Sequence, residues 1–125
     1  MADGLAQSFD FAVRIVQLVK WLEQEEKAFP QARRLLECGT GLGITLRTAK
    51  SLSDRDSLVQ AIRYAEEVQF LLELMVKTEF ITELQSGPLR SECKAIKKEL
   101  LEKRLPLYRA AAEDETQPAR PGRRQ

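Results

Sequence analysis

The 125-residue sequence contains no histidine, only two cysteines and few aromatic residues (6%). Without histidine, Ser-His and Cys-His nucleophilic sites, imidazole metal sites and the Glu-x-x-His pairs of di-iron bundles are all excluded. Cys38 and Cys93 form no CxxC motif, and without an export signal we expect both thiols to be reduced and buried. We therefore predict a protein that is not an enzyme and that binds no metal or cofactor.

The sequence also lacks a strong charge of one sign and a long apolar run. Its formal net charge is +1, whereas dedicated nucleic-acid binders are usually strongly basic. Any nucleic-acid binding would therefore need a local patch of basic residues, or an oligomer that repeats a weakly basic patch in each copy. No apolar run reaches the roughly 18 residues that a membrane span requires, and residues 1–7 do not resemble a secretory signal. We expect a cytoplasmic protein with no membrane partner.

Glycine and proline are scarce (6 and 5 residues), and strong helix formers dominate the remainder. Apolar spacing and capping signals predict four helices, at about 8–26, 30–52, 54–79 and 88–105. Thr82 and Gln85 also have capping-box spacing, which leaves an isolated turn before the fourth helix open. Short connections favour an all-α, antiparallel up-down-up-down four-helix bundle. We expect an N-terminal arm at 1–8, the bundle at 9–108 and a disordered charged tail at 109–125.

The first predicted helix carries more apolar residues than one buried stripe needs. One face consists of Phe9, Ala12, Val13, Val16 and Val19, and the adjacent face of Phe11, Ile15, Leu18 and Leu22. A helix with one side in water needs an apolar arc of only about 100°. The surplus predicts either a deep bundle core or a subunit interface. We place the candidate oligomer interface at Phe11, Ile15, Leu18, Trp21 and Leu22.

Three glycines, Gly39, Gly41 and Gly43, lie inside the second predicted helix. Each costs a helix roughly 1 kcal/mol relative to alanine. Gly39 and Gly43 are four residues apart, so in a helix they share a face and would let another backbone approach closely. A loop is the alternative, but the apolar spacing continues through the glycines and favours helix with a helix-packing role for this pair.

Two groups of basic residues are candidates for contact with nucleic-acid phosphates. They are Arg33, Arg34, Arg47 and Lys50 on the second helix, and Lys94, Lys97, Lys98 and Arg104 on the fourth. The simpler interpretation is a solvated face, because Glu92, Glu99 and Glu102 are interspersed with the second group. Aromatic residues for base stacking are missing from these segments, so any such binding would be salt-sensitive and tolerant of sequence.

Three segments resemble the bacterial four-helix-bundle proteins named for the 23S ribosomal RNA intervening sequence. Residues 11–16 (FAVRIV) with the following LVKW are similar to that family's opening helix. Residues 35–43 (LLECGTGLG) are similar to its LLRSGTSIG segment, and residues 58–81, ending in KTEFI, to its long third helix and closing turn. The resemblance covers roughly residues 9–105.

This resemblance implies a four-helix-bundle protomer, assembly into a ring-like homo-oligomer (a pentamer is expected) and no enzymatic activity. It also implies kinship with accessory proteins of diversity-generating retroelements, which bind nucleic acid and a reverse transcriptase. Expected partners are therefore further copies of the chain, RNA or DNA, and a reverse transcriptase or another protein. The sequence departs from the family pattern at Glu37, which replaces an arginine, and at residues 45–48 (TLRT). The main expectation is an oligomeric scaffold that binds nucleic acid through basic faces, and the alternative is a protein-interaction module without nucleic-acid binding.

Overall fold

The computed structural model describes residues 2–49 and 55–104, and the side chains of 7–49 and 55–102. These residues form α1 (Ala2–Gln24), α2 (Ala32–Thr48), α3 (Arg55–Lys77), α4 (Glu83–Glu99) and a π-helical turn, η1 (Leu100–Arg104), with no strand among them. The predicted all-α, four-helix architecture is confirmed. None of the helices described is both long and apolar enough to cross a lipid bilayer.

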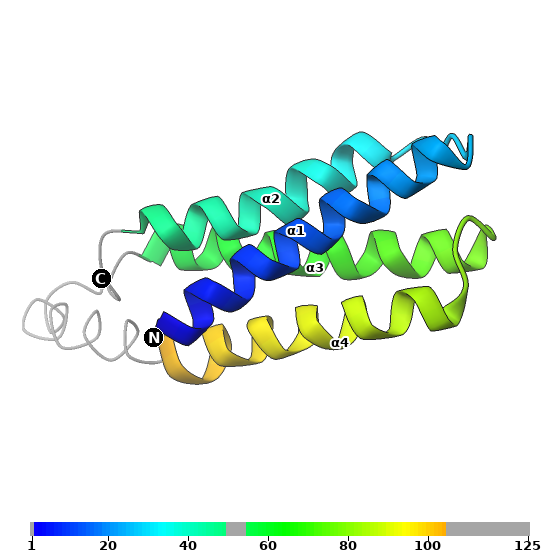
Figure 1. Cartoon of the computed structure of the whole chain (residues 1–125). Coiled ribbons are helices and arrows are strands. Elements are labelled where there is room, and N and C mark those ends of the chain that lie inside the picture. The colour runs from blue at the N-terminus through cyan, green and yellow to red at the C-terminus, as the bar shows by residue number, and fades with distance from the viewer. Residues whose placement is uncertain (1, 50–54, 105–125) are drawn as a thin grey trace, which may run out of the picture.

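The four helices form a bundle in which each helix runs antiparallel to the next (Figure 1). α2 packs against α1 and α3, α4 packs against α3, and a less extensive α1–α4 seam closes the bundle. α2 and α4 are therefore diagonal to each other, as are α1 and α3. Because α1 begins at Ala2, the segment predicted as an N-terminal arm is helical over most of its length. The tail predicted at 109–125 lies outside the described residues.

Each helix contributes one apolar stripe to a continuous core. Burying a large aliphatic or aromatic side chain stabilises a fold by roughly 1.5–3 kcal/mol, so these stripes supply the main driving force. The largest fully buried apolar side chains are Phe11, Ile15, Leu22, Leu35, Leu42, Leu58, Val68, Leu72 and Met75. α2 remains helical through its glycines, and the loop alternative for this segment is wrong.

α1 and α3 end in the same way, with a glutamate in the left-handed conformation. Glu26 has φ 56° and Glu79 has φ 66°. After α1, the Lys27 N–H donates to Leu22 O (2.8 Å) and the Glu26 N–H to Glu23 O (3.1 Å). The equivalent pair of bonds follows α3, where the Phe80 N–H donates to Met75 O (2.9 Å). Both ends are Schellman motifs, which satisfy carbonyls that a helix terminus otherwise leaves unpaired.

The start of α4 differs from the prediction, which placed it at Pro88. α4 begins at Glu83, and Thr82 and Gln85 form a complete capping box with Pro88 inside the helix. The box satisfies two terminal N–H groups, so the helix is established a full turn before the proline. Pro88 removes only the bond to the carbonyl of Leu84, a residue that is 89% exposed and therefore accessible to water.

The α1–α2 and α3–α4 loops lie at the same end of the bundle (Figure 1), and side chains connect them. Lys27 Nζ donates to Phe80 O (3.3 Å) and also lies 4.9 Å from the Trp21 ring centroid. The Phe29 and Phe80 rings pack edge to face, with their centroids 5.1 Å apart. We call Lys27, Phe29 and Phe80 the loop clasp.

Candidate functional site

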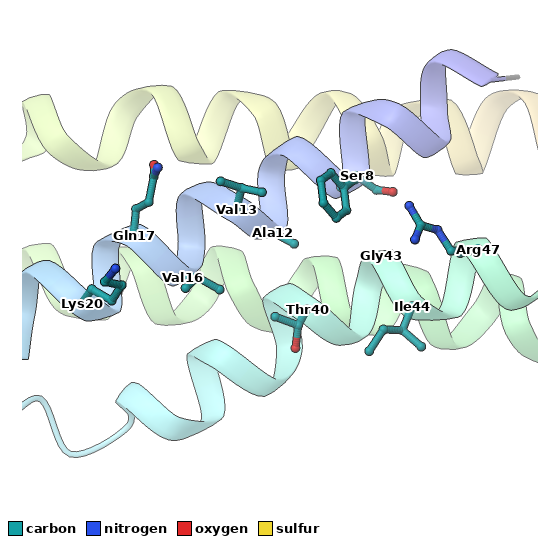
Figure 2. A pocket seen from close by; sticks show the side chains of 11 residues that line it. Ser8, Ala12, Val13, Val16, Gln17, Lys20, Thr40, Gly43, Ile44 and Arg47 are labelled. Atoms are coloured by element: carbon teal, nitrogen blue, oxygen red, sulfur yellow. The ribbon is translucent and has the colours of Figure 1, made fainter.

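An apolar groove runs along the outer side of the α1–α2 seam (Figure 2). Four large apolar side chains line it and remain exposed: Phe9 (52%), Val13 (39%) and Val16 (37%) of α1, and Ile44 (61%) of α2. The groove holds a volume of about 410 Å³. It is the place where exposed apolar side chains of two helices gather on one surface.

The three glycines inside α2 lie against different neighbours. A Cβ added at Gly39 would lie 2.8 Å from Ile15 Cγ2, so glycine is needed for α2 to approach α1 there. A Cβ at Gly41 would lie 2.8 Å from the Tyr64 ring of α3. At Gly43 the nearest atom would be Ser8 O at 3.5 Å, an ordinary contact, and Gly43 lines the groove. A Cβ would therefore clash at Gly39 and would fit at Gly43, although the α1 backbone lies close to Gly43.

The charged residues at the groove are basic. Arg47 lies with its guanidinium carbon 5.4 Å from the Phe9 ring centroid, a cation–π contact, and Lys20 lines the groove further along α1. None of the groove-lining residues is acidic. The groove is thus an apolar surface bordered by positive charge.

The side chains predicted for an oligomer interface lie on the wrong face of α1. Phe11, Ile15 and Leu22 are buried in the core of the single chain, and Leu18 and Trp21 are half-buried against that core. Phe11, Ile15 and Leu22 are therefore not available for a subunit contact, and Leu18 and Trp21 are only partly so. The exposed apolar residues belong to the other face, which the sequence pattern could not distinguish from the core face by composition.

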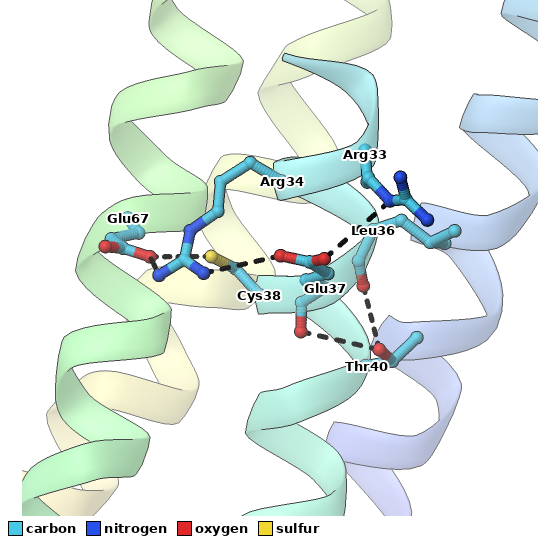
Figure 3. A network of polar contacts seen from close by, with 7 residues as sticks. All are labelled: Arg33, Arg34, Leu36, Glu37, Cys38, Thr40 and Glu67. Carbon is cyan, nitrogen blue, oxygen red and sulfur yellow. Dashed lines mark hydrogen bonds and ion pairs between the residues drawn. The ribbon is translucent and has the colours of Figure 1, made fainter.

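The basic residues at the start of α2 are engaged by acids (Figure 3). Arg34 pairs with Glu67 of α3 (2.5 Å) and with Glu37 (3.4 Å), and Arg33 lies 3.9 Å from Glu37. Glu37 occupies the position where the family pattern has an arginine. A carboxylate that pairs with Arg33 and Arg34 therefore stands in place of a positive charge. Arg33 and Arg34 are consequently poor candidates for binding phosphate.

The two cysteines are buried, reduced and far from reactive. The Cys38 thiol donates to Glu67 Oε1 (2.7 Å), and the Cys93 thiol donates to Ala65 O (3.1 Å). Burial raises the pKa of each thiol to about 12, aided at Cys38 by the bond to Glu67. The Cys38 thiol and the Arg34 guanidinium in turn lower the pKa of Glu67. Neither thiol is a nucleophile near neutral pH, and the described residues contain no cluster of potential metal ligands.

The basic residues of α4 are less neutralised than those of α2. Lys94 and Lys98 are exposed and, within the described part of the chain, no carboxylate lies within 4.0 Å of either. Lys97 lies 4.0 Å from Glu66 of α3. Because α2 and α4 are diagonal, the structure does not gather the predicted basic residues into one surface. Lys50 and the side chain of Arg104 lie outside the described residues.

One solved structure that is similar to this chain is a crystal structure from Bacteroides thetaiotaomicron, of a protein with unknown function from the S23 ribosomal protein family. The two sequences are 35% identical over 78% of this chain and 94% of that one, and the structures superpose with a TM-score of 0.74. No protein-family model matches the sequence, and no curated protein matches it.

Proposed function

Because the chain belongs to the S23 ribosomal protein family, of the 23S rRNA-intervening-sequence type, we propose that it is a self-associating bundle that acts by binding rather than by catalysis. The observation that carries this proposal is the α1–α2 groove, and its occupant is a second copy of the chain. The family resemblance adds the expectation of a closed ring of five copies. The resemblance also implies a reverse transcriptase partner, for which no surface of the described residues offers a specific argument.

The exposed apolar area of the groove supports a contact between copies. Phe9, Val13, Val16 and Ile44 are all large, and together they form a patch rather than isolated exposed residues. Covering them recovers about 25 cal/mol per Å² of apolar surface. A stable interface buries roughly 800 Å² on each partner, so the groove would be its apolar centre and the surrounding polar residues its rim.

The test is the mass of the protein in solution, measured by light scattering or sedimentation at micromolar concentration. The wild-type chain should give a multiple of its 14.2 kDa mass. Val13→Asp, which places a carboxylate inside the groove, should give a monomer with an unchanged circular dichroism spectrum. Ala28→Asp is the matched control, because Ala28 is exposed in the α1–α2 loop and is not a groove residue. A wild-type monomer at these concentrations would overturn the proposal.

Nucleic-acid binding is a second candidate function, and Lys94 and Lys98 are the observation that favours it. They are one helical turn apart, exposed and without a carboxylate partner among the described residues. A ring would repeat this weak patch in every copy, so avidity could raise the overall affinity by orders of magnitude. The contact would be with phosphate and therefore strongly salt-dependent.

Fluorescence anisotropy with a labelled structured RNA and a DNA duplex tests this second function. Binding at low salt should be lost in Lys94→Glu/Lys98→Glu and kept in Arg33→Glu, because Arg33 already lies beside Glu37. Equal losses in the two variants would indicate non-specific attraction to the whole protein. If the wild-type chain binds neither nucleic acid at low salt, the nucleic-acid function is wrong and only the protein-interaction function remains.

A further inference from the structure

α3 presents an exposed aromatic residue on the side of the bundle away from the groove. Phe70 is 63% exposed, and it lies on the helix face opposite the buried Val68 and Leu72. Glu66 and Glu73 are exposed or partly exposed four residues before and three residues after it, so all three share one face. We call Glu66, Phe70 and Glu73 the α3 ridge.

Among the exposed apolar residues outside the groove that the structure describes, Phe70 alone has carboxylates beside it on the same helix face. Outside the groove, the other large exposed apolar residues in the described part of the chain are Leu84 and Leu101. Neither has a carboxylate at the helical spacings that bring side chains together on one face. Phe70 is also the only aromatic residue of the three, and exposed aromatic residues are enriched at protein interfaces.

The α3 ridge and the α1–α2 groove are complementary in polarity and in charge. The groove is apolar, bordered by Lys20 and Arg47 and free of acidic lining residues. The ridge is an apolar ring bordered by Glu66, which also lies 4.0 Å from Lys97 of its own chain, and by Glu73. By contrast, a symmetric contact of groove against groove would bring the basic borders of both copies together, and none of the groove-lining residues is a carboxylate. Like charges in an interface oppose association.

The charged borders of the two surfaces differ in spacing along their helices. At 1.5 Å per residue, Glu66 and Glu73 lie about 10 Å apart along α3, and Phe9, which contacts Arg47, lies about 17 Å from Lys20 along α1. Lysine, arginine and glutamate side chains reach several ångströms each and can span the difference. Arg63 and Lys77, one further step along the same face, are basic. They bound the acidic part of this face on both sides. Glu67, three residues before Phe70, is also acidic but pairs with Arg34 of its own chain.

We propose that the α3 ridge of one copy inserts Phe70 into the α1–α2 groove of the next copy, with Glu66 and Glu73 directed at Lys20 and Arg47. This inference rests on the proposed self-association and names the surface that fills the groove. α3 is diagonal to α1 across the bundle, so a chain cannot fill its own groove. Each copy therefore offers one groove and one ridge, and the contact is heterologous, as a ring requires.

The test is to mix two variants that each lack one half of the contact. Val13→Asp keeps the ridge but blocks the groove, and Phe70→Asp keeps the groove but removes the ridge. Each should be a folded monomer alone. Mixed in equal amounts, they should form a dimer of twice the 14.2 kDa chain mass and nothing larger, because the remaining groove and ridge are the blocked ones. Leu84→Asp, at an exposed leucine without flanking carboxylates, is the control and should assemble like the wild type.

The possible failures are distinguishable. Wild-type assembly by Phe70→Asp would overturn the role of the ridge and leave groove-mediated self-association standing. Two monomeric variants that form no dimer on mixing would overturn the pairing of ridge with groove. A monomeric wild-type chain would overturn the proposed self-association and this inference with it.

Discussion

The inner and outer faces of α1 carry nearly the same kinds of side chain in opposite surroundings. Phe11 and Ile15 on the inner face are fully buried, whereas Phe9 and Val13 on the outer face are about half and two-fifths exposed. The helix itself does not distinguish these faces, since both are apolar at helical spacing. The difference arises from α2, which closes onto Ile15 at Gly39 and leaves a groove where Gly43 lies. The apolar content of a helix therefore indicates how much of its surface is suited to burial. The neighbouring helices determine which part of that surface is buried within the chain.

The largest expected effect compares the two phenylalanines of α1. Phe11→Ala should lower the free energy of unfolding by about 3–5 kcal/mol, because it leaves a cavity in the core. Phe9→Ala should lower it by less than about 1 kcal/mol, since it loses mainly the contact with Arg47. Urea unfolding followed by circular dichroism, in the Val13→Asp background to remove self-association, measures both. Similar losses for the two variants would contradict the assignment of inner and outer faces.

A smaller effect compares the two glycines of the same seam. Gly39→Ala should destabilise the bundle by about 1–3 kcal/mol, because its Cβ would lie 2.8 Å from Ile15. Gly43→Ala should stabilise it by up to about 1 kcal/mol, since the helix gains propensity and the new Cβ has ordinary space. Unfolding of the single variants and of Gly39→Ala with Ile15→Ala measures the clash directly. If Ile15→Ala costs the same with and without Gly39→Ala, the two residues do not interact as described.

The last comparison concerns a pH dependence that belongs to the buried thiols of the interior. The pKa of both thiols is raised to about 12, whereas in the unfolded chain it is near 8.5. Stability from the protonated thiols is complete below the unfolded value and is lost as the pH rises from about 9 towards 12. In this range the free energy of unfolding falls with pH at a slope that corresponds to about two protons, one from each thiol. Urea midpoints at pH 8 and pH 10 should differ less in Cys38→Ala/Cys93→Ala than in the wild type, and an unchanged difference would contradict the burial of the thiols.

Much of the fold follows from the sequence, because helix number, type and order depend on local periodicity. The misplaced start of α4 shows the limit of local signals. The sequence contains two competing signals, a capping box at Thr82 and Gln85 and an interruption at Pro88. The capping box sets the start of α4, and Pro88 lies inside the helix. The resemblance to the 23S rRNA-intervening-sequence proteins is confirmed by the similarity to the Bacteroides thetaiotaomicron protein.

The candidate site was less accessible to prediction, because it depends on contacts between helices. The two faces of α1 are equally apolar, so the sequence predicts a surplus of apolar surface but does not show that Phe9, Val13 and Val16 are the exposed part of it. The pairing of Arg34 with Glu67 joins residues 33 positions apart, which no spacing within a helix reveals. The sequence does not distinguish the charges of Arg33, Arg34, Lys94 and Lys98. In the structure, only the two lysines of these four lack a carboxylate neighbour among the described residues.

The loop clasp has a consequence for the lifetime of the folded bundle. Each pair of consecutive helices is connected by a short link, so most of their contacts are local and can form early in folding. The bond from Lys27 to Phe80 joins residues 53 positions apart and needs both loops to be in place. Interactions that form after the folding barrier slow unfolding without speeding folding. We therefore expect the loop clasp to lower the unfolding rate of the bundle and to have little effect on its folding rate.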